Sequence, residues 1–525
     1  MATMQDFRCN RPGRSHAPTC ATAGRVRGLL VVLGMALTGL AAPLTNAAEF
    51  VVSNDLDAGS GSFQEAVALA NSTQGPDTIS FDSGYFNTPR TVHVDRLRID
   101  DSLTIKGPGR DRLTIQCVTN GAPSGFIIGL SGLEGTNARS TVIEGLTLRA
   151  EAGVPTRGIF HAAHHNLTLR DVHVAGSGQQ LHRYSAAVTS INAELIVEDS
   201  VIENLHSASP GGAVTAFADV EVHPSVESLL SIRRSLIRDN TSAAQGGAFY
   251  VYAGQLDDSF SITIEDSELS NNSSDYRAGA MFASGSFHVT LSNSTLSGNM
   301  AETAYGGALD LVNSGVASAS LSIDGTTITD NSAGTHGGAI STIGSNAPPI
   351  RIANSVIAGN RLLNPAGDPS HDIYAEADVV ASYSLIGASA GSNPSLMVLE
   401  HQSAVGSNIL DTDPMLGPLA DNGGATRTHA IGSGSPLLDA GNAAAPTRNM
   451  ALPRPANDQR GGGFQRVSGP AVDIGAYERQ VNGGGGSAGG SGGGSVGGWT
   501  LAWLALLTAL SAWRRSGGSC RSYES

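Results

Sequence analysis

A repeat of about thirty residues runs through the middle of the chain and limits the fold more than any other feature. Five segments share an aliphatic residue, Ser or Thr three residues later, a second aliphatic residue at five and Asn at eight; these asparagines are Asn240, Asn272, Asn299, Asn331 and Asn360. Small-residue pairs followed by Ala come six or seven residues after most of them: Gly246-Gly247, Ala278-Gly279, Gly306-Gly307 and Gly337-Gly338. Such a period is typical of a solenoid.

Each part of the repeat has a physical interpretation in a coil made of short strands. Aliphatic residues two positions apart point to the same side of a strand, so they enter one shared interior. Asn tolerates the left-handed conformation of a corner, and its amide can bond the amide of the next coil as a ladder. Gly-Gly gives the next corner backbone freedom, and Ala fits where the interior is narrow.

These features together predict the architecture. A helical solenoid needs a period of about 3.6 residues, which these segments lack. We therefore predict an all-β, right-handed parallel β-helix, since parallel crossovers are right-handed. About ten to twelve coils at a spacing of ~4.8 Å would give a stack roughly 55 Å long.

The repeats also resemble a known group of proteins. Gly337–Ile340 and the aliphatic-x-x-Asn steps are similar to the repeats of polymorphic outer-membrane proteins and of other pectate-lyase-like β-helices. This resemblance implies a pectate-lyase-like solenoid that serves mainly as a surface adhesin or passenger. We place the repeats in residues 117–408 and predict that Gly176–Ser185 and Asp219–Glu227 present variable binding loops along one edge.

Residues 48–116 are predicted to form an N-terminal cap and the first coils. Phe50–Asn54 and Thr78–Phe81 have strand patterns, and Ser60–Asn71 has the pattern of a short amphipathic helix. A cap is needed because an open solenoid end invites edge-to-edge pairing. In its order of elements this stretch resembles the CSLREA-type region of bacterial surface β-helices, with Phe63–Ala66 where that family has Leu-Arg-Glu-Ala.

Residues 409–478 are predicted to form a C-terminal closing module. Five ordered motifs in it resemble the choice-of-anchor Q domain: Asp411–Pro414, Leu419–Thr426, Gly434–Gly441, Asp458–Gly461 and Asp473–Glu478. The resemblance implies an anchored surface protein and brings no catalytic residues with it.

The N-terminal end is interpreted as an export signal. Residues 1–47 place Arg25 and Arg27 before a short apolar run and end in small residues, so we expect cleavage near Ala47. Only Cys117 of the four cysteines lies between the two ends, so no disulfide framework or Cys-type metal site is expected within one chain.

The C-terminal end is interpreted as an anchoring signal. Residues 479–498 are a Gly/Ser linker, and 499–525 form an apolar tail that contains a basic pair. This order resembles the GlyGly-type sorting signal of Gram-negative bacteria, which implies processing near Gly497 and Gly498 by a sorting protease of the cell envelope. A plain transmembrane anchor is the alternative. In both cases the body is expected at the cell surface, on the outer membrane or outside the cell.

The charge balance excludes one class of function. The chain carries 31 basic and 46 acidic residues, and eight of the basic but only two of the acidic ones lie in the ends, so the body has a net charge of −21. Such a body repels phosphates, and also polyuronate chains unless cations bridge them. We therefore expect no nucleic-acid partner.

Candidate catalytic groups are sparse. The acidic pairs Asp100-Asp101, Asp257-Asp258 and Glu265-Asp266 place their side chains on opposite faces of a strand, so solvated surface charge is expected. Gly334–Gly337 resembles the Gly-His-Gly of polygalacturonase-like enzymes only superficially, because the partner motifs are missing. Arg233-Arg234 and Arg238 would suit a lyase, but we expect them to form surface ion pairs.

Candidate metal ligands are also weak, and no cofactor is assigned. His161, His164 and His165 form the densest histidine group, but their spacing makes the ring nitrogens diverge along a strand. Capping and turn roles are expected for the loop aspartates of the C-terminal module, with Ca²⁺ binding as the alternative: Asp411, Asp413, Asp439, Asp458 and Asp473.

The sequence thus predicts an exported, surface-anchored β-helix with a structural or adhesive role and no catalysis. Its expected partner is an extracellular glycan or the surface of a host or neighbouring cell. The alternative is a polysaccharide-active enzyme, either a pectate-lyase-like lyase or a glycoside hydrolase. An Arg–carboxylate set or three converging carboxylates in a groove would favour that alternative.

Overall fold

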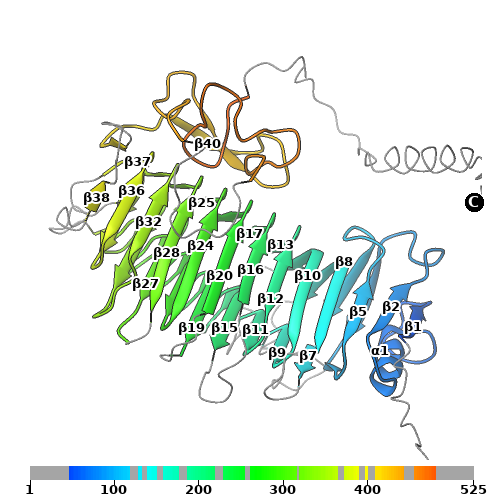
Figure 1. The fold of residues 1–525 in the computed structure, drawn as a ribbon. Coiled ribbons are helices and arrows are strands. Elements are labelled where there is room, and N and C mark those ends of the chain that lie inside the picture. Colours follow the sequence, from blue (N-terminus) through cyan, green and yellow to red (C-terminus); the bar gives the residue numbers. More distant parts are fainter. Residues whose placement is uncertain are drawn as a thin grey trace, which may run out of the picture. The chain divides into compact units, whose positions relative to one another are not determined.

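The computed structural model confirms the predicted parallel β-helix. It describes residues 47–118, 128–132, 139–150, 158–176, 186–218, 229–254, 260–315, 318–364, 372–388, 397–399, 408–442 and 455–480. Nearly all regular structure in these ranges is β, and the strands stack in parallel along one axis (Figure 1). The expected signal, linker and tail lie outside the described residues, apart from Ala47, Arg479 and Gln480. None of the helices in the described ranges is long and apolar enough to cross a membrane.

Sheet A contains 23 strands and supplies two walls of the coils. Its N-terminal strands are β1 (Glu49–Val52), β2 (Asp77–Phe81), β3 (Arg90–Val94), β5 (Leu103–Lys106), β6 (Leu113–Cys117), β8 (Ser140–Ala150) and β10 (Asn166–Ala175). A first row then continues as β12 (Leu195–Glu198), β16 (Leu229–Arg233), β20 (Phe260–Glu265), β24 (Phe287–Ser292), β28 (Ala319–Asp324), β32 (Ile350–Ala353), β36 (Val379–Ser382) and β38 (Met397–Leu399). A second row comprises β13 (Val201–Glu203), β17 (Leu236–Arg238), β21 (Glu268–Ser270), β25 (Thr295–Ser297), β29 (Thr327–Thr329), β33 (Val356–Ala358), β37 (Leu385–Ile386) and β39 (Ile409–Leu410).

Two further parallel sheets close the coils. Sheet B has ten strands: β4 (Leu97–Ile99), β7 (Ile128–Ser131), β9 (Phe160–Ala163), β11 (Val188–Ile191), β15 (Val214–Ala218), β19 (Phe249–Ala253), β23 (Met281–Ser284), β27 (Leu309–Val312), β31 (Ile340–Ile343) and β35 (Ile373–Ala375). Sheet C has six very short strands: β14 (His206–Ser207), β18 (Thr241–Ser242), β22 (Ser273–Ser274), β26 (Met300–Ala301), β30 (Ser332–Ala333) and β34 (Arg361–Leu362).

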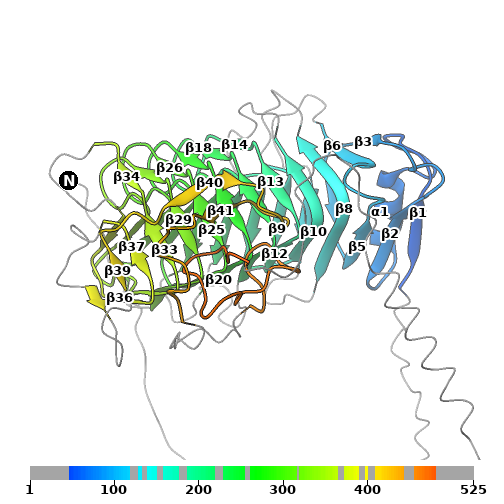
Figure 2. The same cartoon turned by 90° about the horizontal axis from the view of Figure 1, so that it is seen from above.

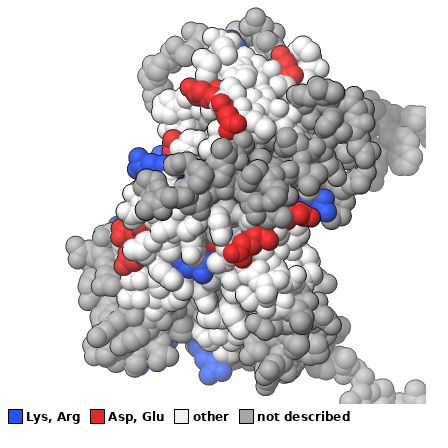
Figure 3. Space-filling model, turned by 90° about the vertical axis from the view of Figure 1, so that its left-hand side faces the viewer, with Lys and Arg blue, Asp and Glu red and all other residues white. Residues whose placement is uncertain are grey.

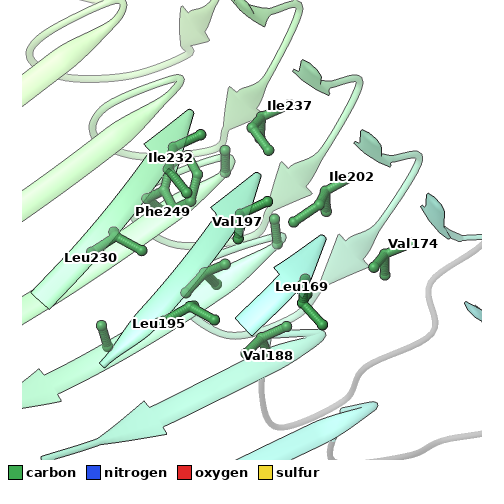
Figure 4. Packing of buried hydrophobic residues seen from close by; sticks show 14 of the residues in the cluster. Leu169, Val174, Val188, Leu195, Val197, Ile202, Leu230, Ile232, Ile237 and Phe249 are labelled. Atoms are coloured by element: carbon green, nitrogen blue, oxygen red, sulfur yellow. The ribbon is translucent and has the colours of Figure 1, made fainter. Parts of the chain in front are cut away.

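The interior of the coils is one continuous hydrophobic core. In each repeat, alternate strand residues point inward and lie over the equivalent residue of the next coil, as Leu195, Leu230 and Ile262 do. Figure 4 shows aliphatic side chains of successive coils in this interior. A single coil cannot cover its own apolar side, so the stack is stable only as a whole.

An asparagine ladder runs along the corner between the second row of sheet A and sheet C. The side-chain Nδ2 of each asparagine donates to the Oδ1 of the next one, at 3.0 Å from Asn240 to Asn272 and from Asn272 to Asn299. The ladder continues through Asn331 and Asn360 at 2.9 Å per step. Each Oδ1 also accepts the backbone N–H of the preceding asparagine, so one amide joins two coils twice.

A buried carboxylate ends this ladder. Asp372 Oδ1 accepts both the backbone N–H of Asn360 at 3.1 Å and its Nδ2 at 2.8 Å. Its Oδ2 accepts the N–H of Ala388 at 2.6 Å. The last asparagine therefore keeps its donors satisfied even though the repeat changes here.

The left-handed conformation expected at these asparagines is found one residue earlier. Positive φ angles occur at the residue immediately before each ladder asparagine: Asp239, Asn271, Gly298, Asp330 and Gly359. The ladder asparagine cannot take the corner conformation as well, because its side chain must point into the stack to reach the next coil. Asn204 is such a corner residue (φ 57°), and Leu205 after it donates its N–H to Asn240.

The Ser or Thr of the repeat forms a second ladder at the corner between the two rows of sheet A. Ser235 donates its hydroxyl to the carbonyl of Arg233 and accepts the backbone N–H of Ser200 at 3.1 Å. Ser267 and Ser294 repeat this arrangement in the next coils. The hydroxyl thus satisfies backbone groups that the corner removes from the sheet.

The two glycines of the third corner have different physical roles. The first has a positive φ, as in Gly246 (68°), Gly306 (69°) and Gly337 (60°). The second approaches the next coil so closely that a Cβ on Gly307 would lie 1.9 Å from the carbonyl oxygen of Gly338. A side chain is excluded there by contact with backbone, which cannot move away.

A short helix covers the first coils, as predicted. Helix α1 (Phe63–Ser72) begins after Ser62, whose hydroxyl accepts the N–H of Glu65, and the Glu65 carboxylate accepts the N–H of Gly61. This pair is similar to a capping box, except that the Glu65 carboxylate bonds the residue before the N-cap. The helix buries Phe63 and Val67 against the core beneath β1, β2 and β4.

The C-terminal module packs on the flank of the stack. It contains the antiparallel pair β40 (Leu416–Ala420) and β41 (Thr428–Ile431) and lies over the second row of sheet A (Figure 2). Arg427 donates to the buried Glu268 of β21, and Gln459 accepts from Thr295 of β25 at 2.6 Å. The N–H of Ala476 donates to Thr327 of β29 at 3.0 Å. The predicted closing module thus covers a side of several coils, and these contacts spread its support along the stack.

The interior of the module is polar as well as apolar. The buried guanidinium of Arg460 donates to Asp458 and lies 3.9 Å from the ring centroids of both Phe464 and Tyr477. The backbone N–H of Glu478 donates to Asp458. The motif around Asp458 is therefore structural, because every one of these groups is held by another part of the module.

The asparagine ladder predicts a large cost for a central substitution. Asn299→Ala removes the acceptor of two Asn272 donors and the donor to Asn331, which leaves buried polar groups unpaired. We expect the free energy of unfolding to fall by about 2–4 kcal/mol, measured by denaturant unfolding. The exposed neighbour Asn271 is a control. Asn271→Gly keeps the positive φ of this corner and should change the free energy of unfolding by less than about 0.5 kcal/mol. Equal effects of the two substitutions would contradict the ladder.

At the second glycine of the third corner, adding a side chain should destabilise the fold by steric contact and not through φ. Gly307→Ala should lower stability by more than about 3 kcal/mol, because the new methyl group meets backbone atoms of the next coil. In Gly462→Ala the methyl group meets open space, so thermal unfolding of that variant should match the wild type. A stable Gly307→Ala variant would show that the coils are not stacked as closely as described.

Candidate functional site

The outer face of sheet B carries the most distinctive side chains of the described chain. Because strand residues alternate, every second residue of this sheet points away from the core. At the outward positions of β15, β19, β23 and β35 stand Phe217, Tyr250, Tyr252, Phe282 and Tyr374. The exposed fraction of Tyr252 is 41%, so this face is only partly covered.

The aromatic groups form a column along the stack, which we call the aromatic column. The rings of Tyr250 and Phe282 stack with centroids 5.5 Å apart and an interplanar angle of 8°. Phe217 meets Tyr250 edge-on at 6.1 Å. The column consists of Phe217, Tyr250, Phe282, Tyr305, His336 and Tyr374, with the guanidinium of Arg277 between the rings of Phe282 and Tyr305.

The second half of the column comes from corner residues. Tyr305 and His336 are the residues directly before two of the repeat glycines, and they pair in parallel from coil to coil. Their ring centroids are 5.0 Å apart, and His336 lies 4.8 Å from the ring of Tyr374. The corner and the strand of adjacent coils thus contribute to one surface.

An ion pair lies within the column, because Asp310 of β27 is in register with Phe282. Arg277 Nε donates to Asp310 of β27, whose side chain is completely buried. Burial raises the pKa of Asp310 to about 6, against the opposing effect of the Arg277 charge. Arg277 is itself 14% exposed and lies 4.9 Å from the ring centroid of Tyr305. The arrangement neutralises the charge of this face and holds the rings around Arg277.

The repeat asparagines and glycines, interpreted from the sequence as structural, lie in the framework of the coil. Asn240, Asn272, Asn299, Asn331 and Asn360 form the buried ladder described above, and the paired glycines form the third corner. None of these residues belongs to the outer face of sheet B. They contribute to the site only indirectly, by keeping the strands of sheet B in register.

The predicted surface ion pairs of the basic residues are confirmed. Arg233 donates to Glu265 at 2.7 Å, Arg234 to Asp199 at 2.7 Å and Arg238 to Glu203 at 2.7 Å. The pairs join neighbouring coils, so charges of opposite sign alternate along the outer side of sheet A. Arginines held in this way are not free to act as a lyase base.

The acidic residues also have partners. Asp266 accepts from Asn293 Nδ2 at 2.5 Å, and burial raises its pKa to about 6. Asp100 accepts from Arg98 and Asp101 accepts the N–H of Ser102. Asp257-Asp258 lies outside the described residues. On the end of the stack that bears β38, charged side chains form small separate groups among uncharged residues (Figure 3).

The predicted metal candidates do not converge in the described ranges. These ranges contain no group of three His, Cys, Asp or Glu side chains placed to hold a metal ion. His165 is buried, which lowers its pKa, and its Nε2 lies 2.9 Å from Thr141 Oγ1. Asp413, Asp439, Asp458 and Asp473 accept backbone N–H groups, the turn and capping role that the sequence indicated for them.

Connections of unequal length border sheet B. Between sheet B and the next strand of sheet A, the chain uses two residues after β23, six after β19 and ten after β15. Loop length here is independent of the coil core, which is the usual way in which a scaffold varies its binding surface. Of the two predicted binding loops, only Gly176 falls within the described residues.

Sequence reasoning missed the aromatic column, although a signal was present. The residue before each small-residue pair and the third residue after it both reach this face, as Arg277 and Phe282 do around Ala278-Gly279. Their types differ from coil to coil, so they do not appear as a repeat. Only the stacking of coils shows that residues about thirty positions apart share one surface.

Comparisons with protein-family models, curated proteins and solved structures find no match for this chain. The fold places it among the parallel β-helix proteins.

The ion pairs of sheet A predict a pH-dependent stability. His173 and Arg238 hydrogen-bond to the Glu203 carboxylate and lower its pKa from 4.5 to about 2. An acid with a lowered pKa stabilises the fold above its unfolded pKa, and this stabilisation is lost as the pH falls from 4.5 toward 2. Glu203→Gln should therefore reduce the free energy of unfolding by about 2 kcal/mol at pH 7.

Unfolding of both proteins at pH 7 and pH 3 checks this prediction, and the difference should shrink by more than half at pH 3. Glu144→Gln serves as control, because Glu144 lies 3.8 Å from Arg170 and is more exposed. A pH-independent difference for Glu203→Gln would contradict the ionic explanation.

Proposed function

We propose that the chain is an exported cell-surface protein whose β-helix binds an extracellular glycan through the outer face of sheet B. The glycan belongs to the surface of a host or of a neighbouring cell, and no catalysis is involved. The observation that carries the proposal is the aromatic column, which continues over successive coils of a sheet that the C-terminal module leaves uncovered.

Export and anchoring are supported by the order of the sequence. A signal-like start, a module similar to choice-of-anchor Q domains and a glycine-rich tail similar to a GlyGly-type sorting signal follow one another along the chain. The CSLREA-like start of the body agrees with this order. A parallel β-helix held by ladders suits such a location, because its stability comes from packing and backbone pairing.

The chemistry of the face favours a hydroxyl-rich partner. Stacked rings cover each other's faces, so the ring edges and tyrosine hydroxyls remain for contacts with a ligand. Tyr250 and Tyr252 supply two such hydroxyls in one strand, and each can donate and accept. Tyr and Arg are also the residue types that contribute most to binding surfaces. The Arg277–Asp310 pair leaves little net charge for an acidic ligand.

A polysaccharide-active enzyme is the second candidate, favoured by the Arg277–Asp310 pair. A pKa of about 6 suits a general acid. The carboxylate must, however, reach the glycosidic bond, and Asp310 is completely buried below Arg277. The binding role therefore agrees better with the geometry.

Binding to a panel of neutral and acidic glycans, with and without Ca²⁺, tests the proposal. We expect the double variant Tyr250→Phe, Tyr252→Phe to bind about tenfold more weakly, since it loses two hydroxyl contacts but keeps both rings. Tyr383→Phe, on the sheet A side, should bind like the wild type. Release of shortened products from any glycan would favour the enzyme, and unchanged binding of the double variant would remove the aromatic face from the proposal.

A further inference from the structure

The position at which the chain leaves the folded body bears on how an anchored protein would be oriented. The last described residues, Arg479 and Gln480, are hydrogen-bonded to the C-terminal module: Arg479 N–H donates to Asp473 at 2.7 Å, and Gln480 Nε2 donates to the carbonyl of Gln465 at 3.0 Å. The exit point is therefore fixed by the seat of the module on the stack.

This part of the module lies over inner coils. Asn293, at the corner between β24 and β25, donates to the carbonyl of Asn457 at 3.2 Å. Arg466, next to Gln465, approaches Gly325 at the corner between β28 and β29 so closely that a Cβ there would be 3.0 Å from its Nη2. The exit thus lies beside β24 and β28, on the flank of the stack.

The exit is far from the N-terminal end. Along sheet A, eight pairing steps separate β24 from β1, whereas four separate it from β38. At ~4.8 Å a step these are about 38 Å and about 19 Å. A flexible Gly/Ser segment of the length of 481–498 would have a root-mean-square reach of about 24 Å. This reach is comparable with the distance to the β38 end and shorter than the distance to the N-terminal end, so the N-terminal cap is not the part that attachment brings nearest to the membrane.

The flank with the module and the face with the aromatic column lie on different sides. In Figure 1 the module is drawn above the second row of sheet A, and the strands of sheet B are at the opposite side of the stack. Two exposed apolar side chains, Met415 and Val467, belong to the module.

We propose that the anchored protein is held by its flank, so that the stack lies along the cell surface and the outer face of sheet B is directed away from it. This inference rests on the proposed anchoring and adds its geometry. A module at the β38 end of the stack would instead hold the molecule upright, and the N-terminal cap would then be the part farthest from the membrane. Side-on attachment presents the whole aromatic column to a partner at once.

Energy transfer from single labelled positions to a membrane dye tests this orientation. The full chain, with the cysteines of its two ends replaced by Ser, is incorporated into phosphatidylcholine vesicles that contain a lipid-linked acceptor. Donors are attached at three exposed positions through Val467→Cys, Leu56→Cys and Tyr252→Cys. Cys117 is buried, so it should not react in the folded protein.

Side-on attachment predicts the order of transfer Val467 above Leu56 above Tyr252, because the cap then lies nearer to the membrane than the outer face of sheet B. Upright attachment predicts more transfer from Tyr252 than from Leu56, since Leu56 is then at the end of the stack farthest from the membrane. That order would overturn the inference. No transfer from any position would show instead that the tail does not anchor the protein, and the proposed anchoring would fail with the orientation that depends on it.

Discussion

The structure depends on the exact superposition of corners in successive coils, and buried side-chain amides and hydroxyls maintain that superposition. Parallel strands alone allow a coil to slip by two residues without exposing its apolar side chains. The ladder from Asn240 to Asn360 removes this freedom, because each amide bonds both the side chain and the backbone of its neighbour. The serine ladder does the same at another corner. Unpaired amides in the core would be costly, so register and stability are coupled.

A consequence of this register is that a surface can be built from residues far apart in the chain. Tyr250, Phe282 and Tyr374 come from three coils, yet their rings belong to one column because their strands pair in parallel without a shift. The inward residues of the repeat can stay constant while the outward ones vary. The same scaffold therefore separates stability, which the ladders provide, from recognition, which the outward side chains provide.

The C-terminal module changes how the stack can be used. Its contacts with Glu268, Thr295 and Thr327 commit the outer side of the second row to an internal interface. The outward residues of the second row differ along the stack: β13 and β17 carry the charged Glu203 and Arg238 beside Val201 and Leu236, whereas β29 and β33 carry Thr327, Thr329, Val356 and Ala358. Sheet B is left to face outward, and this division of surfaces gives the proposed binding role its place.

The sequence by itself determined the coil: its period, its inward aliphatic residues, its ladder asparagines and its glycine corners, because each follows from local geometry repeated along the chain. It also determined the capping helix, since Ser62 and Glu65 act within a few residues of each other. Tertiary structure alone decided which residue of each corner takes the left-handed conformation, since the asparagine side chain is needed by the next coil. It also decided the seat of the module and the aromatic column, because both depend on contacts between residues separated by about thirty to more than one hundred and fifty positions, which no local pattern records.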